Sequence, residues 1–272
     1  MAGGTAIRPS ANPNRIPSPN TPAGDMVRDK FIRDLLDICG DVRAYWLPKW
    51  TDGTTTIGVS RQARVFTYDA TIAARISALG SAAQVDFDGG DDEADTPDTA
   101  NLSFGDGVVD KPFSVLWLGT PDTDTSVQTL VSKMNSATVD EWELFIEVTT
   151  GHIAFDLVDA SASAFIGRQD ETAIGTSAVF IAATYDGSGA IGGINLYKDA
   201  ALVDDANSAA TTGTYVAMED TASLLRLGNR FATNEGFYNG KMALAAVVGK
   251  ALDIEEIWAI KAAINGFFDL SL

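Results

Sequence analysis

The feature that most constrains the fold of this chain is a succession of short apolar runs, closed by Gly, Asp, Asn or Thr, from about residue 54 onward. Such runs with turn residues between them are typical of the strands of a β-sandwich or jelly roll. We therefore predict an all-β fold, an antiparallel β-sandwich. The predicted strands are Phe113–Leu118, Val127–Ser132, Glu141–Val148, Ile153–Val158, Ala178–Tyr185, Ile194–Lys198, Leu224–Gly228 and Lys241–Val248.

The run from residue 141 to residue 148 shows strand periodicity most clearly. One face would hold Trp142, Leu144, Ile146 and Val148, and the other Glu141, Glu143, Phe145 and Glu147. An alternation with period two predicts a strand with one face in the core and the other largely in water.

The charge is unevenly distributed. The chain holds 19 basic and 37 acidic residues, a net charge of -18, which argues against a nucleic-acid partner. Residues 1–80 hold 10 basic and 7 acidic residues, whereas the remaining 192 hold 9 and 30. This asymmetry indicates that the N-terminal part has a different role from the acidic body.

Several classes of site and segment lack support in the sequence. One cysteine, Cys39, and one histidine, His152, exclude an internal disulfide and a zinc site built only from those residue types. No phosphate-binding glycine loop is present. No apolar run has the length of a membrane span, and the first 24 residues lack the apolar core of a signal peptide. We expect a soluble protein made in a cytoplasm.

Residues 1–24 are rich in proline and are predicted to form an extended arm or a disordered tail. As an arm they would present Arg8 and Arg15 to a partner. Anchoring such an arm also requires apolar contacts, because exposed charge pairs contribute little. The residues assigned to this assembly role are Ile7, Arg8, Arg15, Ile16, Val27 and Phe31.

Residues 25–53 are predicted to form an amphipathic helix and an aromatic connector before the sandwich of residues 54–272. Asp25 would cap the helix, and Gly40 suits the left-handed position after its end. The connector from Ala44 to Trp50 is either a cover packed on the sandwich or a binding platform. A second helix follows a D-x-x-E capping box at Asp253, with Gly266 as its predicted end.

Five phrases occur in the order known from one family. They are Val85–Asp92 with Thr96-Pro97-Asp98, Lys111–Val115, Ala183–Asp199, Leu225–Lys241 and Ala251–Ile257. This succession resembles the laminin G-like, or concanavalin A-like, jelly-roll domains over about residues 80–266. The chain departs from the pattern at Asp199-Ala200, where a glycine turn is usual, and at Asp253, where serine is usual. The resemblance implies two packed antiparallel sheets.

The arrangement of carboxyl groups in the glucanases of that family can be compared with the acidic residues of this chain. Retaining enzymes need two carboxyl groups about 5–5.5 Å apart. Glu141, Glu143 and Glu147 share a predicted face, but Phe145 stands where those enzymes place an aspartate. We therefore predict no catalytic residue and interpret the glutamates as a solvated strand face.

Calcium is the one cofactor for which the sequence contains candidate ligands. Hard cations prefer six to eight oxygen ligands, and acidic residues are dense between Asp86 and Glu93. The candidate ligands are Asp88, Asp91 and Asp92, with an acidic exposed loop as the alternative interpretation.

Three functions remain open. The first is a structural or decoration protein of a tailed-phage virion, assembled in the host cytoplasm, held by its arm to capsid or tail subunits and to copies of itself. Its sandwich would then display a lectin-like surface to host glycans, with no nucleic acid and no membrane insertion. The second is a free carbohydrate-binding module, and the third is a glycoside hydrolase. The helix-and-connector phrase Leu35–Pro48 resembles laminin G-like proteins encoded in phage structural regions, which favours the first.

Overall fold

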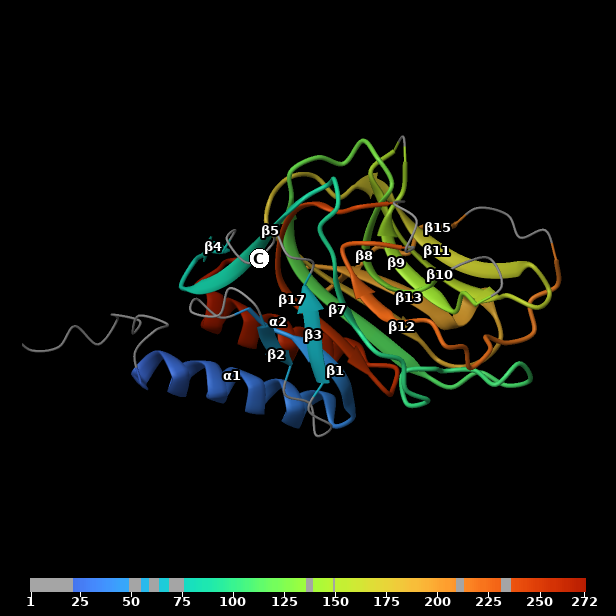
Figure 1. The fold of residues 1–272 in the computed structure, drawn as a ribbon, viewed down its shortest axis with the longest axis horizontal. Helices are drawn as coiled ribbons and strands as arrows, with labels where there is room; N and C mark the ends of the chain where they lie inside the picture. The colour runs from blue at the N-terminus through green and yellow to red at the C-terminus, as the bar shows by residue number, and fades with distance from the viewer. Residues whose placement is uncertain are drawn as a thin grey trace, which may run out of the picture.

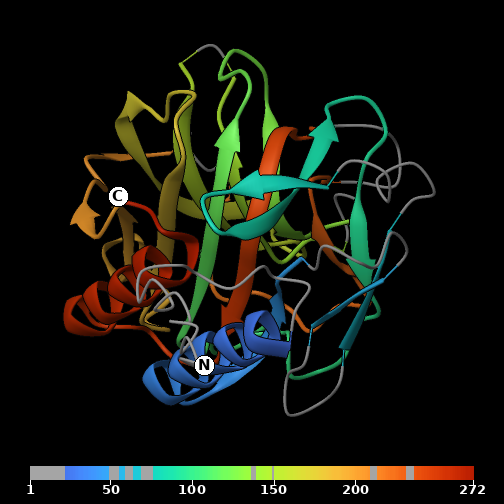
Figure 2. The same cartoon turned by 90° about the vertical axis from the view of Figure 1, so that its left-hand side faces the viewer.

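The structure is a computed structural model that describes residues 22–48, 55–58, 64–68, 76–135, 139–148, 150–208, 213–230 and 236–272. Two antiparallel sheets pack face to face, and two helices lie beside each other on the outer side of one sheet (Figures 1 and 2). The predicted all-β antiparallel sandwich is confirmed.

Sheet A has the strand order β14-β13-β12-β7-β17-β5-β4, with β1 also paired to β17. Its strands are β1 (Val42–Trp46), β4 (Ile76–Leu79), β5 (Ala82–Asp88), β7 (Phe113–Pro121), β12 (Val179–Tyr185), β13 (Ile194–Lys198), β14 (Ala201–Leu202) and β17 (Asn239–Val248). A short 3-10 helix, η2 (Ile191–Gly193), precedes β13.

Sheet B has the strand order β15-β11-β10-β9-β8-β16-β6-β3-β2. Its strands are β2 (Thr55–Gly58), β3 (Arg64–Tyr68), β6 (Ala94–Thr96), β8 (Gln128–Lys133), β9 (Trp142–Ile146), β10 (His152–Asp159), β11 (Ala164–Ala173), β15 (Ala206–Asn207) and β16 (Leu225–Leu227). All eight runs predicted to be strands lie in one of the two sheets.

The molecule has two apolar cores, one on each face of sheet A. The inner core lies between the sheets and includes Trp117, Trp142 and Phe155. The outer core lies between sheet A and the helices, and it includes Phe31, Leu116 and Ile260. Every residue of β12 is buried, because both faces of that strand are covered. Strands of this kind are apolar throughout, whereas β9 and β10 alternate.

The helix α1 (Pro22–Cys39) begins at Pro22, so Asp25 lies within it instead of capping it, and residues 22–24 are not part of an extended arm. Proline suits the first helical turn because its φ is already helical and its missing N–H needs no partner there. The predicted end is confirmed, since Gly40 has a φ of 71°. Residues 1–21 lie outside the described residues.

The connector after α1 belongs to the sandwich. β1 pairs with β17 from Val42↔Val248 to Trp46↔Ala245, so the predicted domain boundary at residue 54 is too late. Tyr45, Trp46 and Leu47 are each at most 1% exposed, which makes this stretch a cover on the sheet and not a binding platform. Lys49 and Trp50 lie outside the described residues.

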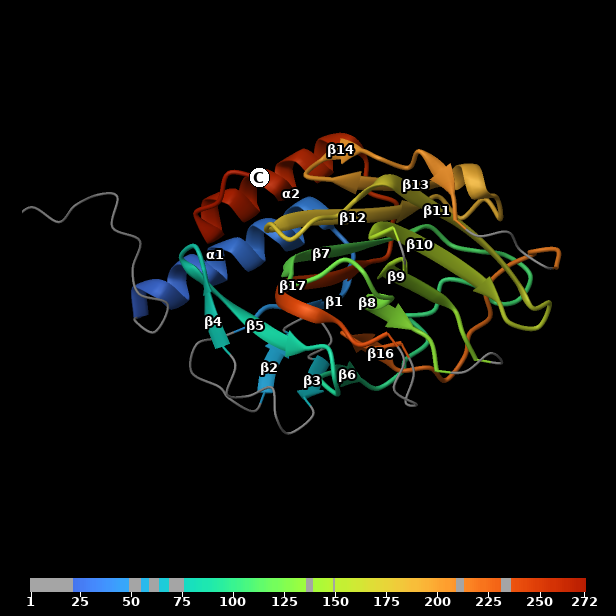
Figure 3. The same cartoon turned by 90° about the horizontal axis from the view of Figure 1, so that it is seen from above.

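The helix α2 (Ile254–Phe268) has the predicted capping box, in which Asp253 accepts from the Glu256 backbone N–H at 2.8 Å. It does not end at Gly266, because Phe268 still packs in the outer core and Asp269 takes the left-handed conformation. It covers the face of sheet A and not its edge (Figure 3). No helix among the described residues is long and apolar enough to span a membrane.

Candidate functional site

A row of polar side chains crosses the outer face of sheet B. Cross-strand neighbours in antiparallel strands point to the same face, and the register links six positions in turn. These positions are Asp95, Arg226, Ser132, Glu143, Asp156 and Gly167. The alternate residues Leu225, Leu227, Leu144 and Phe155 lie in the inner core. The row therefore lies on the side away from the inner core, and no α-helix of the described chain covers it (Figure 3).

Two carboxyl groups lie opposite each other at the centre of the row. Glu143 on β9 is 1% exposed, accepts from Thr129 Oγ1 at 2.6 Å and lies 3.3 Å from Arg230 Nε. Asp156 on β10 accepts from Ser208 Oγ at 2.5 Å. Thr129 and Arg230 bracket the pair on one side and Ser208 on the other.

Gly167 leaves the space that the Asp156 carboxyl occupies. A Cβ at this position of β11 would lie 1.9 Å from Asp156 Oδ1 and 2.2 Å from Ser208 Oγ. Any larger residue would displace the carboxyl group. The close approach of the two strands is therefore needed for the Asp156–Ser208 contact.

The electrostatics of the pair favour the protonated state of Asp156. Burial raises the pKa of Asp156 to about 7, with the Glu143 carboxylate adding to the rise while Ser208 and Arg230 oppose it. Burial likewise raises the pKa of Glu143, and Arg230 and Thr129 oppose that rise. Asp156 can thus change its protonation state near neutral pH, and its half-buried carboxyl group can accept hydrogen bonds from a polar ligand.

The predicted solvated face of β9 is wrong. Glu141 is fully buried, and its Oε1 accepts from Lys133 Nζ at 2.5 Å and from the Thr221 backbone N–H at 2.9 Å. Lys133 is also fully buried and lies 2.9 Å from Asp98 Oδ1. The alternation identified the face correctly but could not reveal the charged partners that allow it to be buried. Val148, predicted on the apolar face, is 43% exposed because β9 ends at Ile146.

The three glutamates considered for catalysis are in three different environments. Glu141 belongs to the ion pair with Lys133, Glu143 to the polar row, and Glu147 to the β9–β10 turn, where it accepts from Thr150 Oγ1 at 2.7 Å. Phe145, between the last two, is half-buried on the outer face. This arrangement offers an aromatic ring beside carboxyl oxygens, which suits ligand binding.

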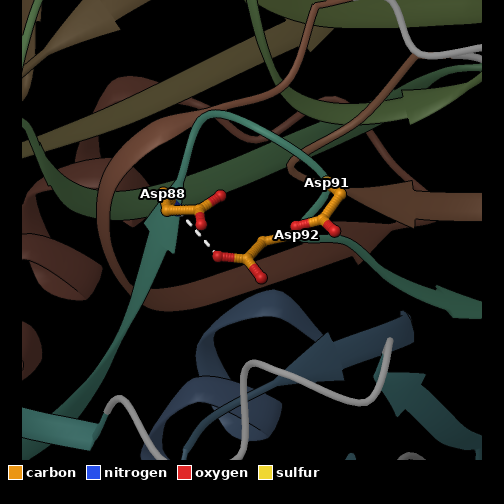
Figure 4. Close-up of side chains that lie close together, drawn as sticks. All are labelled: Asp88, Asp91 and Asp92. Carbon is orange, nitrogen blue, oxygen red and sulfur yellow. Dashed lines mark hydrogen bonds between the residues drawn. The ribbon is translucent and has the colours of Figure 1, made fainter.

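The three aspartates predicted as calcium ligands do come together (Figure 4). One oxygen from each of Asp88, Asp91 and Asp92 lies within 4.8 Å of the other two. Two of these carboxyls also hold the loop, since Asp92 accepts from the Asp88 N–H at 2.7 Å and Asp88 from the Gly90 N–H at 2.9 Å. The donor set fits a hard cation in chemistry, but three carboxylates supply only part of the six to eight oxygens of calcium.

The remaining predicted site residues belong to the assembly arm. Ile7, Arg8, Arg15 and Ile16 lie outside the described residues. Phe31 is 3% exposed and stacks on Phe267 of α2, so its contacts lie within the molecule. Val27 is half-buried and faces a groove between the helices.

Sequence reasoning missed most of the polar row. Asp156 and Arg226 each stand between apolar residues of a strand, which was the available signal. Ser208 and Arg230 come from loops distant in sequence, and no local pattern connects them to β9 or β10.

Comparison with known proteins places the fold in a family. The profile of the concanavalin A-like lectin/glucanases superfamily matches residues 88–258. No curated protein matches the chain.

Among solved structures, the chain is similar to three receptor-binding domains of botulinum neurotoxins. The serotype D binding domain has a TM-score of 0.60 and 12% identity, with 84% of this chain and 52% of that chain covered. A structure of botulinum neurotoxin type C, whose cell entry depends on interaction with two ganglioside molecules, has a TM-score of 0.62 and 12% identity, with 85% of this chain and 53% of that chain covered. The type G domain has a TM-score of 0.57 and 12% identity over 82% and 51%. The chain spans about half the length of these structures, and the likeness concerns the fold.

Proposed function

Because the chain belongs to the concanavalin A-like lectin/glucanases superfamily, we propose that it is a non-catalytic glycan-binding module displayed on a phage virion. The polar row on the outer face of sheet B is the observation that carries the binding part of this proposal. Sheet A is covered by α1 and α2, whereas no α-helix of the described chain covers sheet B, on whose outer face Phe145 and Asp156 are half-buried.

The chemistry of the row suits a sugar. Glycans present hydroxyl groups and one apolar ring face, and binding sites for such ligands combine a few placed polar groups with aromatic side chains. Asp156 provides an acceptor, Arg230, whose side chain is 33% exposed, provides a donor, and the half-buried Phe145 provides a ring on the same face. The proposed ligand contacts Phe145 and the Asp156 side of the pair.

A non-catalytic role is supported by the state of the glutamates. Glu141 and Glu143 are engaged by Lys133 and Arg230, and Glu147 lies at a turn. The similar solved structures are binding domains. Measurable cleavage of a β-glucan, abolished by Glu143→Gln, would contradict this part.

The virion part of the proposal rests on charge distribution and on the two faces. Residues 1–21 hold two arginines and no acidic residue, whereas the rest of the chain holds 17 basic and 37 acidic residues. A basic segment on the helix-covered side would hold the molecule to capsid or tail subunits, and sheet B would face the host surface. We place the protein in the virion, assembled in the host cytoplasm.

The binding part is tested on a glycan array with the full-length chain, followed by titration calorimetry on the best ligand. Phe145→Ala and Asp156→Asn should each weaken binding at least about tenfold, or ~1.4 kcal/mol. Asp34→Asn, on α1 over the opposite sheet, is the matched control and should bind as the wild type does. An array without any ligand, or equal affinity of all variants, would contradict the proposal.

A further inference from the structure

The helices α1 and α2 meet at one aromatic contact and leave a groove beside it. Phe31 stacks on Phe267 with ring centroids 4.6 Å apart and meets Phe268 edge-on at 6.0 Å. The groove next to these rings has a volume of about 280 Å³. It is lined by Val27, Lys30, Phe31 and Asp34 of α1 and by Ala262, Ala263, Gly266 and Phe267 of α2.

On the α2 side, this groove is lined largely by small residues. Ala262 and Gly266 are exposed one helical turn apart, and a Cβ at Gly266 would meet nothing within 4 Å. Glycine within a helix costs about 1 kcal/mol relative to alanine. Nothing within the described molecule requires a glycine here, whereas an extended chain lying in the groove would approach the backbone of α2 most closely at this position.

The chain itself contains a segment that fits. The 21 residues before α1 end at Thr21, directly before Pro22, the first residue of the helix. Val27, near this same end of α1, lines the groove. They include Arg15-Ile16-Pro17-Ser18-Pro19, which joins a branched apolar side chain to residues that favour an extended backbone. Their two arginines and lack of acidic residues complement the acidic body. On the groove wall, Asp34 lies 2.5 Å from Lys30, and its carboxylate can accept from a second cation as well.

The sequence directly before α1 indicates that residues 1–21 reach the groove of another copy more readily than the groove of their own copy. Proline disfavours the helical region for the residue before it, so Ile16, Ser18 and Thr21 are all biased toward extended conformations. A chain that leaves α1 extended moves away from its own groove, and a return would need a tight reversal within this run.

We propose that the groove between α1 and α2 of one copy receives the Ile16-Pro17 part of the N-terminal segment of a second copy. Ile16 fills the space over Gly266 beside Val27, and Arg15 lies near Asp34. The contact is head-to-tail, so it joins copies into a ring or a chain. This proposal rests on the virion part of the proposed function in one respect, that the N-terminal segment binds a neighbouring subunit. It does not depend on glycan binding.

The test is sedimentation velocity of the full-length protein over a wide concentration range. Gly266→Leu fills the groove, Ala262→Glu blocks its wall as a second variant, and Ile16→Asp disables the segment. Gly192→Leu is the matched control, since a Cβ at that glycine of η2 also meets nothing within 4 Å. Circular dichroism and thermal unfolding establish that each variant is folded.

The wild type and Gly192→Leu should self-associate with rising concentration, and the three other variants at least about tenfold more weakly. An equimolar mixture of Gly266→Leu and Ile16→Asp should form a 1:1 pair, because one intact segment meets one intact groove. A monomeric wild type, wild-type association of the groove variants, or a monomeric mixture would each overturn the proposal. If the groove variants self-associate as the wild type does while Phe145→Ala and Asp156→Asn lose glycan binding, the groove proposal alone fails.

Discussion

At the scale of single residues, sheet B shows how charged side chains are accommodated by partners from distant segments. Lys133 and Glu141 are both fully buried, 2.5 Å apart. Thr221 adds a backbone N–H and a hydroxyl to Glu141, and its carbonyl accepts from Lys133 at 3.2 Å. A buried pair contributes little net stability, but either member alone would be an uncompensated charge.

Lys133→Met should therefore lower the free energy of unfolding by about 3–5 kcal/mol. The double variant Lys133→Met/Glu141→Leu should recover much of that loss, because it removes the fully buried Glu141 carboxylate together with its partner, and Asp98, which also loses Lys133, has a side chain that is 25% exposed to water. Urea unfolding of the wild type, both single variants and the double variant provides the measurement. If Lys133→Met lowers the free energy of unfolding by less than about 1 kcal/mol, the pair behaves energetically as an exposed ion pair does, which would contradict its burial.

Asp156 makes stability depend on pH. Its pKa in the folded chain is about 7, above the usual value of 3.8, so the folded state keeps a proton that the unfolded state has released between these values. The free energy of unfolding should thus fall as pH rises through this window. Asp156→Asn should reduce the fall and be most stabilising, relative to wild type, above about pH 7.

The measurement is thermal unfolding of wild type and Asp156→Asn across this pH range. Because Glu143 lies opposite Asp156, the two carboxyls titrate as a pair. The slope that remains in Asp156→Asn comes from Glu143 and from the other carboxyls whose pKa burial raises, among them Glu141 and Asp110. Asp34→Asn, a half-buried position on α1 over the opposite sheet, should follow the wild-type profile. An Asp156→Asn profile parallel to the wild type would contradict the account.

At the scale of secondary structure elements, the turn between β13 and β14 is strained. Asp199 and Ala200 join β13 to β14 with φ values of 50° and 62°, at the position where the family resemblance predicts glycine. The turn is held from three sides. Asp199 Oδ1 accepts from the Phe180 N–H, Lys261 donates to the Asp199 carbonyl, and Trp258 Nε1 donates to the Ala200 carbonyl.

The left-handed conformation costs a non-glycine residue about 1–2 kcal/mol, whereas packing of the Ala200 methyl group stabilises the fold and offsets part of this cost. Ala200→Gly should therefore raise the free energy of unfolding by about 0.5–1 kcal/mol. Differential scanning calorimetry should show a rise in Tm of about 1–4 °C. Ala201→Gly, one residue later in β14 and exposed, is the control and should not raise Tm. A lower Tm for Ala200→Gly would mean that the turn is not strained.

The elements also show what the sequence could predict. Period two identified β9, and the capping box identified α2, because both patterns are local. β11 was missed, since its Gly-Arg-Gln-Asp-Glu stretch lacks an apolar run. The burial of Glu141 and Glu143 was not predictable, because Thr221 and Arg230 approach them from far along the chain. The aspartate cluster was predictable, because its three residues lie within five positions.

At the scale of the whole molecule, the two sheets have different surroundings. Sheet A is enclosed by the inner core and by the helices, whereas sheet B presents its polar row outward. The first described residue, Pro22, begins α1 on the helix-covered side of sheet A. This division fits a molecule held by one side and binding with the other.

Deletion of residues 1–21 should leave a folded sandwich, because α1 and both cores remain complete. Under the proposed virion role, the truncated protein should no longer be incorporated into the particle. Purified virions carrying only the truncated form, with copy number measured by quantitative mass spectrometry, provide the test. Arg8→Ala/Arg15→Ala, which keeps the segment length, should reduce incorporation less. Normal copy number of the truncated form would make the segment a passive tail.

The most direct test of the central claim, that the outer face of sheet B binds a glycan, is hydrogen–deuterium exchange of the full-length chain with and without the best array ligand. We expect slower exchange in β8, β9, β10 and the segment around Ser208, and unchanged exchange in α1 and α2. Asp156→Asn should abolish the protection at the same ligand concentration. Protection confined to the helices or to the Asp88–Asp92 loop, with sheet B unchanged, would contradict the account.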